Sequence, residues 1–384
     1  MPLVIFLLAA AVFSQGTSEF MLSGLLPDIA ADLGITVPQA GLLTSAFAVG
    51  MAVGAPLMAA ISRSWPPRLA LSSFLLAFIA VHIVGALTDD FGVLLTTRIV
   101  AALTNAGFLA VTLSTVSALV PAERTARALA VILGGTTLAL ILGVPAGAVV
   151  GAVFDWRAAL WGVAIISVPA LIAIVLGTPT SAASHAGNTV SLMTELRVLR
   201  RRVLLAPLML CALVNAATFC AYTYLAPLVT DSAGLQAGLV PVVFGAFGIG
   251  SFIGVWVAGR FGDHYASRIL SVGGVGLLLG WTALATLSTL PIAFILLVLT
   301  QGALSFAVGS TLIAASIRAA AAAPTMSGSF ATASLNVGAA AGPILGGLTY
   351  ASAAGATGPV VVSAALILLA ATGYIVLRFM KATP

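Results

Sequence analysis

The sequence contains two charged side chains in stretches that are otherwise apolar. Glu19 follows residues 3–13, which carry no charge, and Arg98 is the only charge in residues 93–119. A charge near the centre of a bilayer costs at least about 2.5–3.5 kcal/mol on insertion scales, so such residues are functional candidates. A carboxyl group can carry a proton, whereas a guanidinium stays protonated and can only act on a neighbouring charge. The two residues therefore point to proton chemistry inside a membrane.

The composition places the whole chain in a membrane. Of the 384 residues, 61% are hydrophobic and only 7% are charged, and the mean hydropathy is +1.20. A soluble domain carries roughly 25% charged residues, so water cannot solvate this chain. About 20 apolar residues cross a bilayer, which leaves room for about a dozen spans. Each span must satisfy its own backbone hydrogen bonds, so the sequence predicts an all-α membrane protein.

Twelve apolar runs, separated by polar turns, divide the chain into two sets of six. The runs cover residues 3–26, 40–61, 69–87, 93–119, 128–151, 158–177, 203–228, 236–258, 268–287, 291–316, 328–350 and 357–379. A long polar connector separates the two sets. We therefore expect an N-terminal six-helix bundle over residues 1–177, a cytoplasmic linker over 178–202 and a C-terminal six-helix bundle over 203–384.

The distribution of charge predicts the orientation of the chain. With the N-terminus in the cytoplasm, thirteen of the fifteen basic residues fall on the cytoplasmic side, the exceptions being Arg98 and Arg157. The opposite orientation violates the positive-inside rule. Abundant Arg, Ala and Gly with a single Lys are typical of a GC-rich bacterial genome. We expect a multi-pass protein of the bacterial inner (plasma) membrane with both termini in the cytoplasm.

The two sets of runs resemble each other in sequence. LLPDIAADLG ends the first run as LAPLVTDSAG ends the seventh, GVPAGAVVG in the fifth matches GPILGGLTY in the eleventh, and SRSWPPR after the second corresponds to GRFGDHYASR after the eighth. Repeated six-helix halves are a known transporter design, with the substrate site near the midplane between them. Chance similarity among glycine-rich helices is the alternative, and three matches at corresponding positions argue against it.

Three segments carry a resemblance to a known family. They are GTSEFMLSGLLPDIAADLG in the first run, RIVAALTNAGF in the fourth, and GVPAGAVVG followed by FDWRAALW in the fifth and sixth. Over essentially its whole length the chain resembles the major facilitator superfamily, and more narrowly the twelve-helix drug:proton antiporter family and its chloramphenicol-efflux branch. The resemblance implies the major facilitator fold. It also implies a proton-coupled antiporter that exports an amphipathic antibiotic, of chloramphenicol type, by alternating access.

The resemblance further implies residues that control gating. Gly143, Pro145 and Gly147 in the fifth run match an antiporter motif that shapes the seal between the halves, although this spacing equally describes a bent, closely packed helix. After the eighth run, a second set matches a cytoplasmic latch and consists of Gly259, Asp263 and Arg268. We expect the acid of this set near a helix start, with a solvated loop acid as the alternative. The corresponding connection after the second run has no acid, so we expect the latch in the second half alone.

The geometry of ideal helices places Glu19 and Arg98 at similar depths. Glu19 lies about 24 Å along a helix that starts near Leu3, some 6 Å below the outer edge of a 30 Å core. Arg98 lies about 8 Å below the same edge. The two charges can face each other, either as a static ion pair or as a proton carrier and the cation that tunes it. Burial favours the neutral acid and Arg98 favours the carboxylate, so a conformational change could alter the protonation of Glu19.

Polar residues at helical spacing extend this site. Runs one, four, seven and ten line the cavity in the family that the chain resembles, and their candidate substrate-binding residues are Gln15, Ser23, Asn105, Asn215, Phe219, Tyr222 and Gln301. A drug cavity has mostly apolar walls with a few placed hydrogen-bonding groups, as these faces provide. Ordinary hydrogen bonds between transmembrane helices are the alternative. His82 could join a proton relay, or could simply be a packed residue near a helix end.

Several features that would indicate other functions are missing from the sequence. It has no phosphate-binding P-loop, no metal-ligand cluster and no nucleophile–base pair, so we expect no enzymatic activity, no cofactor, no metal and no nucleic-acid partner. We expect a monomer in the lipid bilayer whose partners are a small-molecule drug and protons. Proton-coupled efflux of a sugar, nucleoside or other metabolite is the alternative. A channel, a membrane enzyme and uptake by symport are further alternatives, and the first two lack their typical polar rings or clusters.

Overall fold

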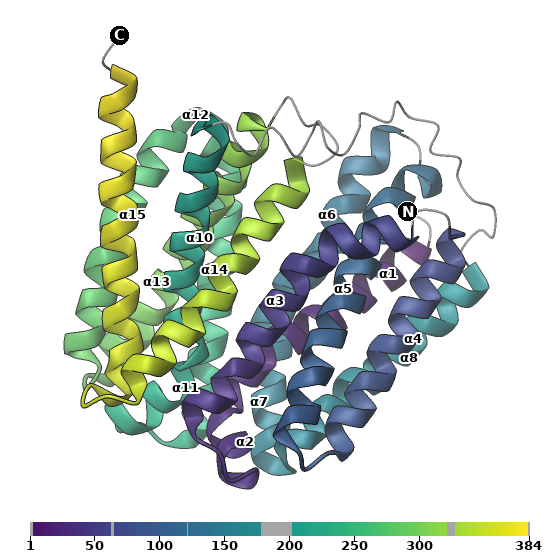
Figure 1. Cartoon of the computed structure of the whole chain (residues 1–384), viewed down its shortest axis with the longest axis horizontal. Coiled ribbons are helices and arrows are strands. Elements are labelled where there is room, and N and C mark those ends of the chain that lie inside the picture. Colours follow the sequence, from purple (N-terminus) through teal and green to yellow (C-terminus); the bar gives the residue numbers. More distant parts are fainter. Residues whose placement is uncertain (1–2, 63–64, 121, 178–201, 321–326, 383–384) are drawn as a thin grey trace.

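The computed structural model describes residues 3–62, 65–120, 122–177, 202–320 and 327–382 (Figure 1). Regular structure within these ranges is entirely helical. The predicted linker lies almost wholly outside the described residues, so the proposed domain boundaries stay predictions.

The N-terminal set of helices follows the predicted runs. It consists of α1 (Leu3–Met21), η1 (Leu22–Gly24), α2 (Leu26–Asp32), α3 (Val37–Ile61), α4 (Pro67–Leu87), α5 (Phe91–Leu119), α6 (Ala122–Leu138), η3 (Ala139–Gly143), α7 (Val144–Val153) and α8 (Trp156–Gly177). The helix α3 begins earlier than predicted because Thr36 and Gln39 form a capping box that satisfies its first backbone donors. The π-helical turn η3 precedes Pro145, which lacks a backbone donor and so disturbs the regular helical ladder.

The C-terminal set repeats this plan. It consists of α10 (Arg202–Thr223), α11 (Leu225–Pro227), η5 (Leu228–Ser232), η6 (Ala237–Leu239), α12 (Val240–Leu287), α13 (Pro291–Ala319), α14 (Ser327–Tyr350), η7 (Gly355–Thr357) and α15 (Gly358–Ala382). Among the described residues, ten helical segments are long and apolar enough to cross a membrane. One of them, Ala237–Leu287, spans 51 residues and holds two predicted spans, and α14 adds another. The prediction of twelve transmembrane helices in two six-helix bundles is confirmed.

The connection between the eighth and ninth predicted runs is helical, which corrects the prediction of a loop over 259–267. Within α12 only Tyr265 leaves helical geometry, with φ −119° and ψ 20°. Asp263 therefore lies inside a helical segment and not near a helix start. A single non-helical residue is enough to separate two membrane spans here.

The backbone repeats the internal symmetry seen in the sequence. Pro27 and Pro227 lie in matching segments, which end at Gly34 and Gly234 with φ of 61° and 62°. This left-handed conformation favours glycine at both positions. The shared turn sets a register of 200 residues between α1 and α10, in which Glu19 corresponds to Phe219.

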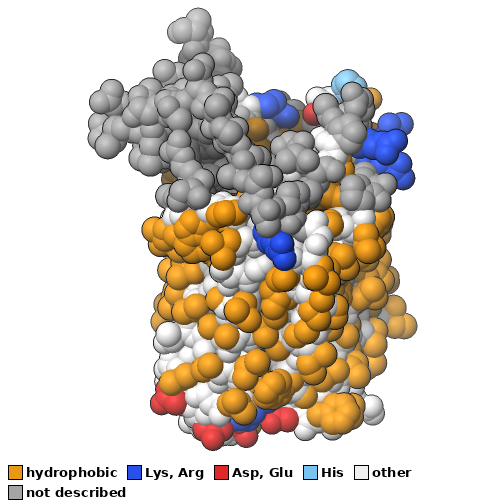
Figure 2. All heavy atoms as spheres, turned by 90° about the vertical axis from the view of Figure 1, so that its right-hand side faces the viewer, with side chains coloured by type: hydrophobic (Ala, Val, Ile, Leu, Met, Phe, Trp, Pro, Cys, Tyr) orange, Lys and Arg blue, Asp and Glu red, His pale blue; other side chains and the backbone are white. Residues whose placement is uncertain are grey.

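The two bundles meet near one end of the molecule. In Figure 1 they lie close together around α2, α7 and α11 and diverge toward the end that holds the N-terminus. Figure 2 shows a broad hydrophobic belt with acidic side chains at one end and basic side chains toward the other. From their places at the ends of the spans we define the acidic end by Asp28, Asp32, Asp89, Asp90, Asp155 and Asp231, and the basic end by Arg68, Arg124, Arg127, Arg260, Arg268 and Arg318.

Candidate functional site

Arg98 is held inside the N-terminal bundle by a single residue of α1. Its Nη1 donates to Ser18 Oγ at 2.8 Å, and its Nη2 donates to the Ser18 carbonyl at 2.7 Å. The guanidinium carbon lies 4.5 Å from the centre of the Phe47 ring, a cation–π contact between α5 and α3. Arg98 is 2% exposed, so its charge depends on these groups for stabilisation.

His82 continues the polar contacts of Arg98. Its Nδ1 lies 2.7 Å from the Phe78 carbonyl, which can only accept, so Nδ1 carries a hydrogen. Its Nε2 lies 2.6 Å from Ser18 Oγ. With a neutral imidazole every bond has a donor: Arg98 donates to Ser18, Ser18 donates to Nε2, and Nδ1 donates to the carbonyl. An imidazolium at His82 would instead bring a second cation next to Arg98.

Glu19 lies beside this chain of hydrogen bonds without joining it. Its side chain is half-buried, and no hydrogen bond or ion pair of Glu19 is found within the described part of the chain. It lies within electrostatic range of both Arg98 and Tyr222. The two predicted proton-coupling residues are therefore neighbours, but the static ion pair weighed as an alternative does not form in this conformation.

Four of the predicted substrate-binding residues bury polar atoms that no described residue satisfies. They are Gln15, with both amide atoms, Ser23, Tyr222, and Gln301 with its side-chain oxygen, and they are 0–3% exposed. An unsatisfied buried polar group costs about 1–3 kcal/mol, so such groups call for an explanation. A ligand or water that reaches these atoms would remove the cost.

An aromatic cluster joins the two bundles beside Glu19. The Tyr222 ring packs against Phe219, Phe244 and Phe247 of the C-terminal bundle, with centroid distances of 5.9, 5.1 and 4.8 Å. Phe20 of α1 reaches across to Phe219 at 5.9 Å and to Tyr222 at 6.4 Å. Because Phe20 follows Glu19 in the chain, any shift of one bundle against the other changes the surroundings of the carboxyl group.

The remaining predicted substrate-binding residues are less closely grouped. Asn105 is buried on α5, two helical turns from Arg98. Asn215 donates to the Leu335 carbonyl at 2.7 Å and joins α10 to α14. Gln301 is fully buried against Gly276 of α12, at 3.5 Å, and lies inside the C-terminal bundle. The structure thus gives Asn215 and Gln301 the helix–helix contacts that were the alternative to a binding role.

The predicted glycine motif packs two helices of the N-terminal bundle together. A Cβ at Gly143 would collide with the Thr17 hydroxyl, and one at Gly147 would meet the Met21 Cβ at 3.2 Å. In the second half, a Cβ at Gly342 would collide with the backbone of α10. Small residues let neighbouring backbones approach in both halves, as the packing interpretation of the motif requires.

The segment that holds the glycine motif, η3 and the start of α7, also contacts the C-terminal bundle. The nearest atom to a Cβ built on Gly245 of α12 is Pro145 Cγ, at 3.7 Å, and a Cβ at Gly248 would meet the Leu140 carbonyl at 2.5 Å. The motif therefore lies both in a packing face and in the contact between the halves, so the two interpretations of the motif are compatible.

The residues of the predicted latch lie exposed at the basic end. Asp263 and Arg318 approach to 3.9 Å, and the Arg268 guanidinium lies 5.5 Å from the Tyr265 ring. Both contacts stay within the C-terminal bundle, and exposed ion pairs are worth about 0–1 kcal/mol. A Cβ at Gly259 would meet no atom within 4 Å, so no close packing requires glycine there.

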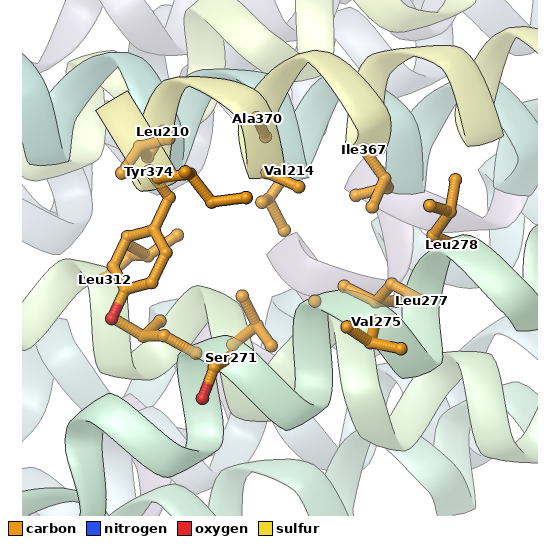
Figure 3. Close-up of a pocket in the computed structure, with 15 residues that line it drawn as sticks. Leu210, Val214, Ser271, Val275, Leu277, Leu278, Leu312, Ile367, Ala370 and Tyr374 are labelled. Carbon is orange, nitrogen blue, oxygen red and sulfur yellow. The ribbon is translucent and has the colours of Figure 1, made fainter. Parts of the chain in front are cut away.

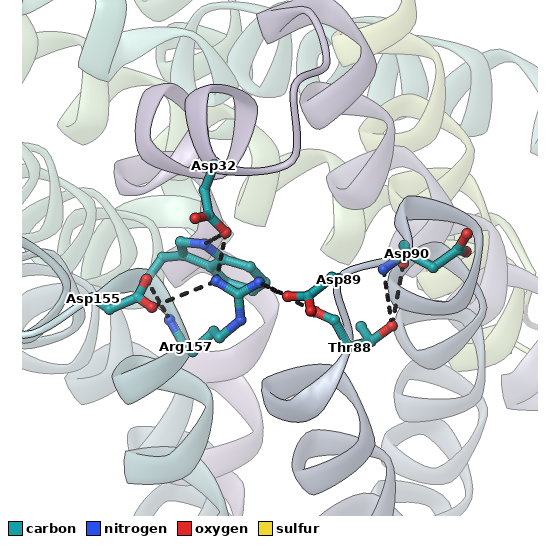
Figure 4. A network of polar contacts seen from close by, with 7 residues as sticks. Asp32, Thr88, Asp89, Asp90, Asp155 and Arg157 are labelled. Carbon is teal, nitrogen blue, oxygen red and sulfur yellow. Dashed lines mark hydrogen bonds and ion pairs between the residues drawn. The ribbon is translucent and has the colours of Figure 1, made fainter.

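A second charged network closes the acidic end (Figure 4). Arg157 of α8 pairs with Asp32 of α2, Asp89 before α5 and Asp155, and Trp156 Nε1 donates to Asp32 at 3.1 Å. The Arg157 guanidinium and the Trp156 indole hold the pKa of Asp32 below its ordinary value. This network explains the position of Arg157, an exception to the charge distribution, because three acids surround it.

One residue of the central site, Ser18, is not among the residues predicted from the sequence. His82 is predicted either as part of a proton relay or as a packed residue near a helix end. The available signal was the position of Ser18 directly before Glu19. Spacing within one helix could not show that α1, α4 and α5 bring Ser18, His82 and Arg98 together.

Comparison with known proteins identifies the family. Residues 8–334 match the model of the Major Facilitator Superfamily. The chain belongs to this superfamily. It is 53% identical over 371 residues to a chloramphenicol resistance protein of Streptomyces lividans, covering 96% of this chain and 95% of that protein. This relative confirms the resemblance to the branch predicted from the sequence.

More distant superfamily members share the fold. An uncharacterized MFS-type transporter of Bacillus subtilis is 32% identical over 257 residues, which cover 67% of this chain and 64% of the relative. A crystal structure of a mutant nucleoside transporter, NupG, superposes with a TM-score of 0.79 at 11% identity, covering 98% and 99% of the two chains. A bacterial homolog of the human lysosomal transporter Spinster superposes with a TM-score of 0.76 at 16% identity, covering 97% and 95%. The protein is thus a membrane transporter of the Major Facilitator Superfamily.

Proposed function

We propose that the protein is a proton-coupled antiporter that exports a chloramphenicol-type antibiotic by alternating access. The substrate class rests on the identity of 53% with the chloramphenicol resistance protein over almost the whole of both chains. The mechanism rests on one observation: Glu19 is half-buried within electrostatic range of Arg98 and Tyr222, and it has no ion pair with any described residue.

Glu19 is the proposed proton carrier. Among the ten acidic residues it alone lies well inside a predicted span. Because Arg98 is held by Ser18, Glu19 can gain or lose a proton without breaking an ion pair. The guanidinium nevertheless stabilises the carboxylate from nearby, since opposite charges attract strongly where water is scarce. Arg98 serves as the tuning cation and is held by Ser18, whose hydroxyl in turn contacts His82.

The proposed drug site adjoins the proton site. Gln15, Ser23 and Tyr222 offer buried hydrogen-bonding atoms that have no partner among the described residues, and the rings of Phe20 and Phe219 supply apolar walls. This combination suits an aromatic drug that carries hydroxyl and amide groups. Asn105 remains a candidate on α5, whereas Asn215 and Gln301 are better explained as links between helices.

The proposed cycle moves the two bundles against each other. In the present conformation they meet near the acidic end (Figure 1), which we assign to the outer face by the positive-inside rule. Moving one charge across 100 mV supplies about 2.3 kcal/mol. That corresponds to roughly a fifty-fold drug gradient at 1.36 kcal/mol per decade. One proton per cycle is therefore sufficient to lower the internal drug concentration substantially.

Transport by the purified protein tests this function. Proteoliposomes with an imposed pH gradient are expected to move radiolabelled chloramphenicol toward the acidic side, and an uncoupler is expected to abolish the movement. Florfenicol is expected to compete with the labelled drug. Movement of a labelled nucleoside or sugar without movement of either drug would favour metabolite efflux and overturn the proposed substrate.

A further inference from the structure

The C-terminal bundle contains an apolar cavity that the proposed transport cycle does not use. It has a volume of about 220 Å³ and lies between α10, α12, α13 and α15 (Figure 3). Its deepest residues are Leu277, Leu312 and Ile367, each at most 3% exposed. Drug-sized pockets are typically 300–1,000 Å³, so the cavity suits a slender chain better than a whole drug.

The mouth of the cavity faces the membrane. Val275 of α12 and Ile375 of α15 line it and are 58% and 52% exposed. Among the described elements, the helices that pack extensively on α15 all belong to the C-terminal bundle. Figure 1 places α15 on the outer side of this bundle, away from the N-terminal helices. An opening beside α15 at this position meets the hydrocarbon of the bilayer.

The polarity of the cavity changes along its length. Figure 3 shows the hydroxyl groups of Ser271 and Tyr374 on the same side of the cavity, whereas Ile367 and Leu278 line the opposite, wholly apolar side. Arg268 precedes Ser271 by three residues, about 4.5 Å along the helix axis, and is exposed at the basic end. The cavity thus runs from a hydroxyl-bearing side, which is the side nearer to Arg268 along α12, into an apolar interior.

We infer that this cavity binds one acyl chain of an anionic phospholipid, with the phosphate group at Arg268. The bilayer supplies acyl chains at the depth of the mouth, and a soluble partner cannot reach it. Basic residues at the edge of a transmembrane bundle attract anionic headgroups. The apolar lining matches the acyl chain, and the cationic side chain of Arg268, three residues before Ser271, matches the anionic headgroup.

Two substitutions on α12 test the cavity directly. Gly274 lines it, and a Cβ there would meet no atom within 4 Å, so Gly274→Trp can fill the cavity without a clash at the backbone. Val272→Trp is the matched control, because Val272 is 71% exposed and lies outside the lining. Native mass spectrometry of the full-length protein in mild detergent, with added phosphatidylglycerol or phosphatidylcholine, counts the bound lipids.

The wild type and Val272→Trp are expected to retain one phosphatidylglycerol, and Gly274→Trp is expected to lose it. In Arg268→Gln the preference for phosphatidylglycerol over phosphatidylcholine is expected to fall about fivefold. Retention of the lipid by Gly274→Trp, or equal binding of both lipids by the wild type, would overturn the inference. So would displacement of the lipid by chloramphenicol at this site. Lipid binding is measured without transport, so the result is independent of the proposed function.

Discussion

Arg98 and Ser18 are joined by two hydrogen bonds, at 2.8 and 2.7 Å, although an acidic residue follows Ser18 in the chain. The guanidinium therefore acts on Glu19 electrostatically, without forming an ion pair with its carboxylate. A buried ion pair would resist separation, because removing one partner strands the other charge. In the proposed mechanism, this arrangement leaves the carboxyl group free to exchange its proton.

Removing the Ser18 hydroxyl is expected to disturb coupling as well as stability. Ser18→Ala leaves Arg98 Nη1 and His82 Nε2 without their partner, at a cost of about 1–3 kcal/mol for each group. A released guanidinium can approach Glu19 and favour its carboxylate. Protonation then needs a higher proton concentration, so the pH profile of drug transport should move to lower pH.

Ser14→Ala is the control for this prediction. Ser14 lies one turn earlier on α1 and donates to the Val163 carbonyl at 3.0 Å, away from Arg98. It should lower the thermal stability by a similar amount and leave the pH profile unchanged. An identical profile in both variants would show that Ser18 has only a structural role.

Substitutions of two nearby tyrosines, Tyr222 and Tyr224, are expected to distinguish an effect on drug binding from an effect on stability. The Tyr222 hydroxyl has no partner within the described residues, whereas the Tyr224 hydroxyl donates to the Pro343 carbonyl at 2.8 Å. Tyr222→Phe should leave unfolding nearly unchanged and weaken chloramphenicol binding roughly two- to tenfold, the worth of one hydrogen bond. Tyr224→Phe should lower the stability of the protein and leave its affinity for chloramphenicol nearly unchanged. Equal drug affinity in wild type and Tyr222→Phe, measured by equilibrium binding, would remove Tyr222 from the site.

The packing of α1 against η3 is expected to tolerate no side chain at Gly143. A methyl group there collides with the Thr17 hydroxyl, and overpacking typically costs 1–3 kcal/mol. Gly134→Ala is the matched control, because no atom lies within 4 Å of its added Cβ. The midpoint of thermal unfolding should be clearly lower for Gly143→Ala than for the wild type, and it should not fall for Gly134→Ala. Similar midpoints for the two variants would contradict the close approach.

The network at the acidic end is expected to stabilise the protein at neutral pH and not in acid. Because the folded state lowers the pKa of Asp32, its contribution is present above the ordinary value of about 3.9 and disappears as the pH falls through the lower folded value. Asp32→Asn should therefore unfold at a lower temperature than the wild type at pH 7. The difference should become smaller as the pH falls below about 3.9, and a difference as large at pH 3 as at pH 7 would assign it to another cause.

The sequence predicted the fold well because membrane spans are long and their order is simple. All twelve apolar runs are helical, with the eighth and ninth joined in α12, and the matching segments around Pro27 and Pro227 folded alike. The kink at Tyr265 was not predicted, because a helical connection and a loop share the same polar composition. Capping by Thr36 likewise moved a helix start that hydropathy alone could not place.

The site was harder to predict because a bilayer is as apolar as a protein core. The pattern of apolar residues therefore does not show which face of each helix points into the bundle. The residues that a polar side chain contacts cannot then be predicted from the sequence. Gln301 shares a face with other polar groups in the sequence, yet it contacts α12 inside its own bundle. The contacts that join Ser18 to His82 and Arg98 became apparent only when three helices were placed together.

Glu19 is the central residue of the proposed mechanism, because it is the proposed site of proton binding. Glu19→Gln keeps the size of the side chain and removes its ability to release a proton. In proteoliposomes this variant should still exchange labelled chloramphenicol for unlabelled drug, while accumulation driven by a pH gradient is lost. Accumulation driven by the pH gradient at the wild-type level in Glu19→Gln would contradict the account.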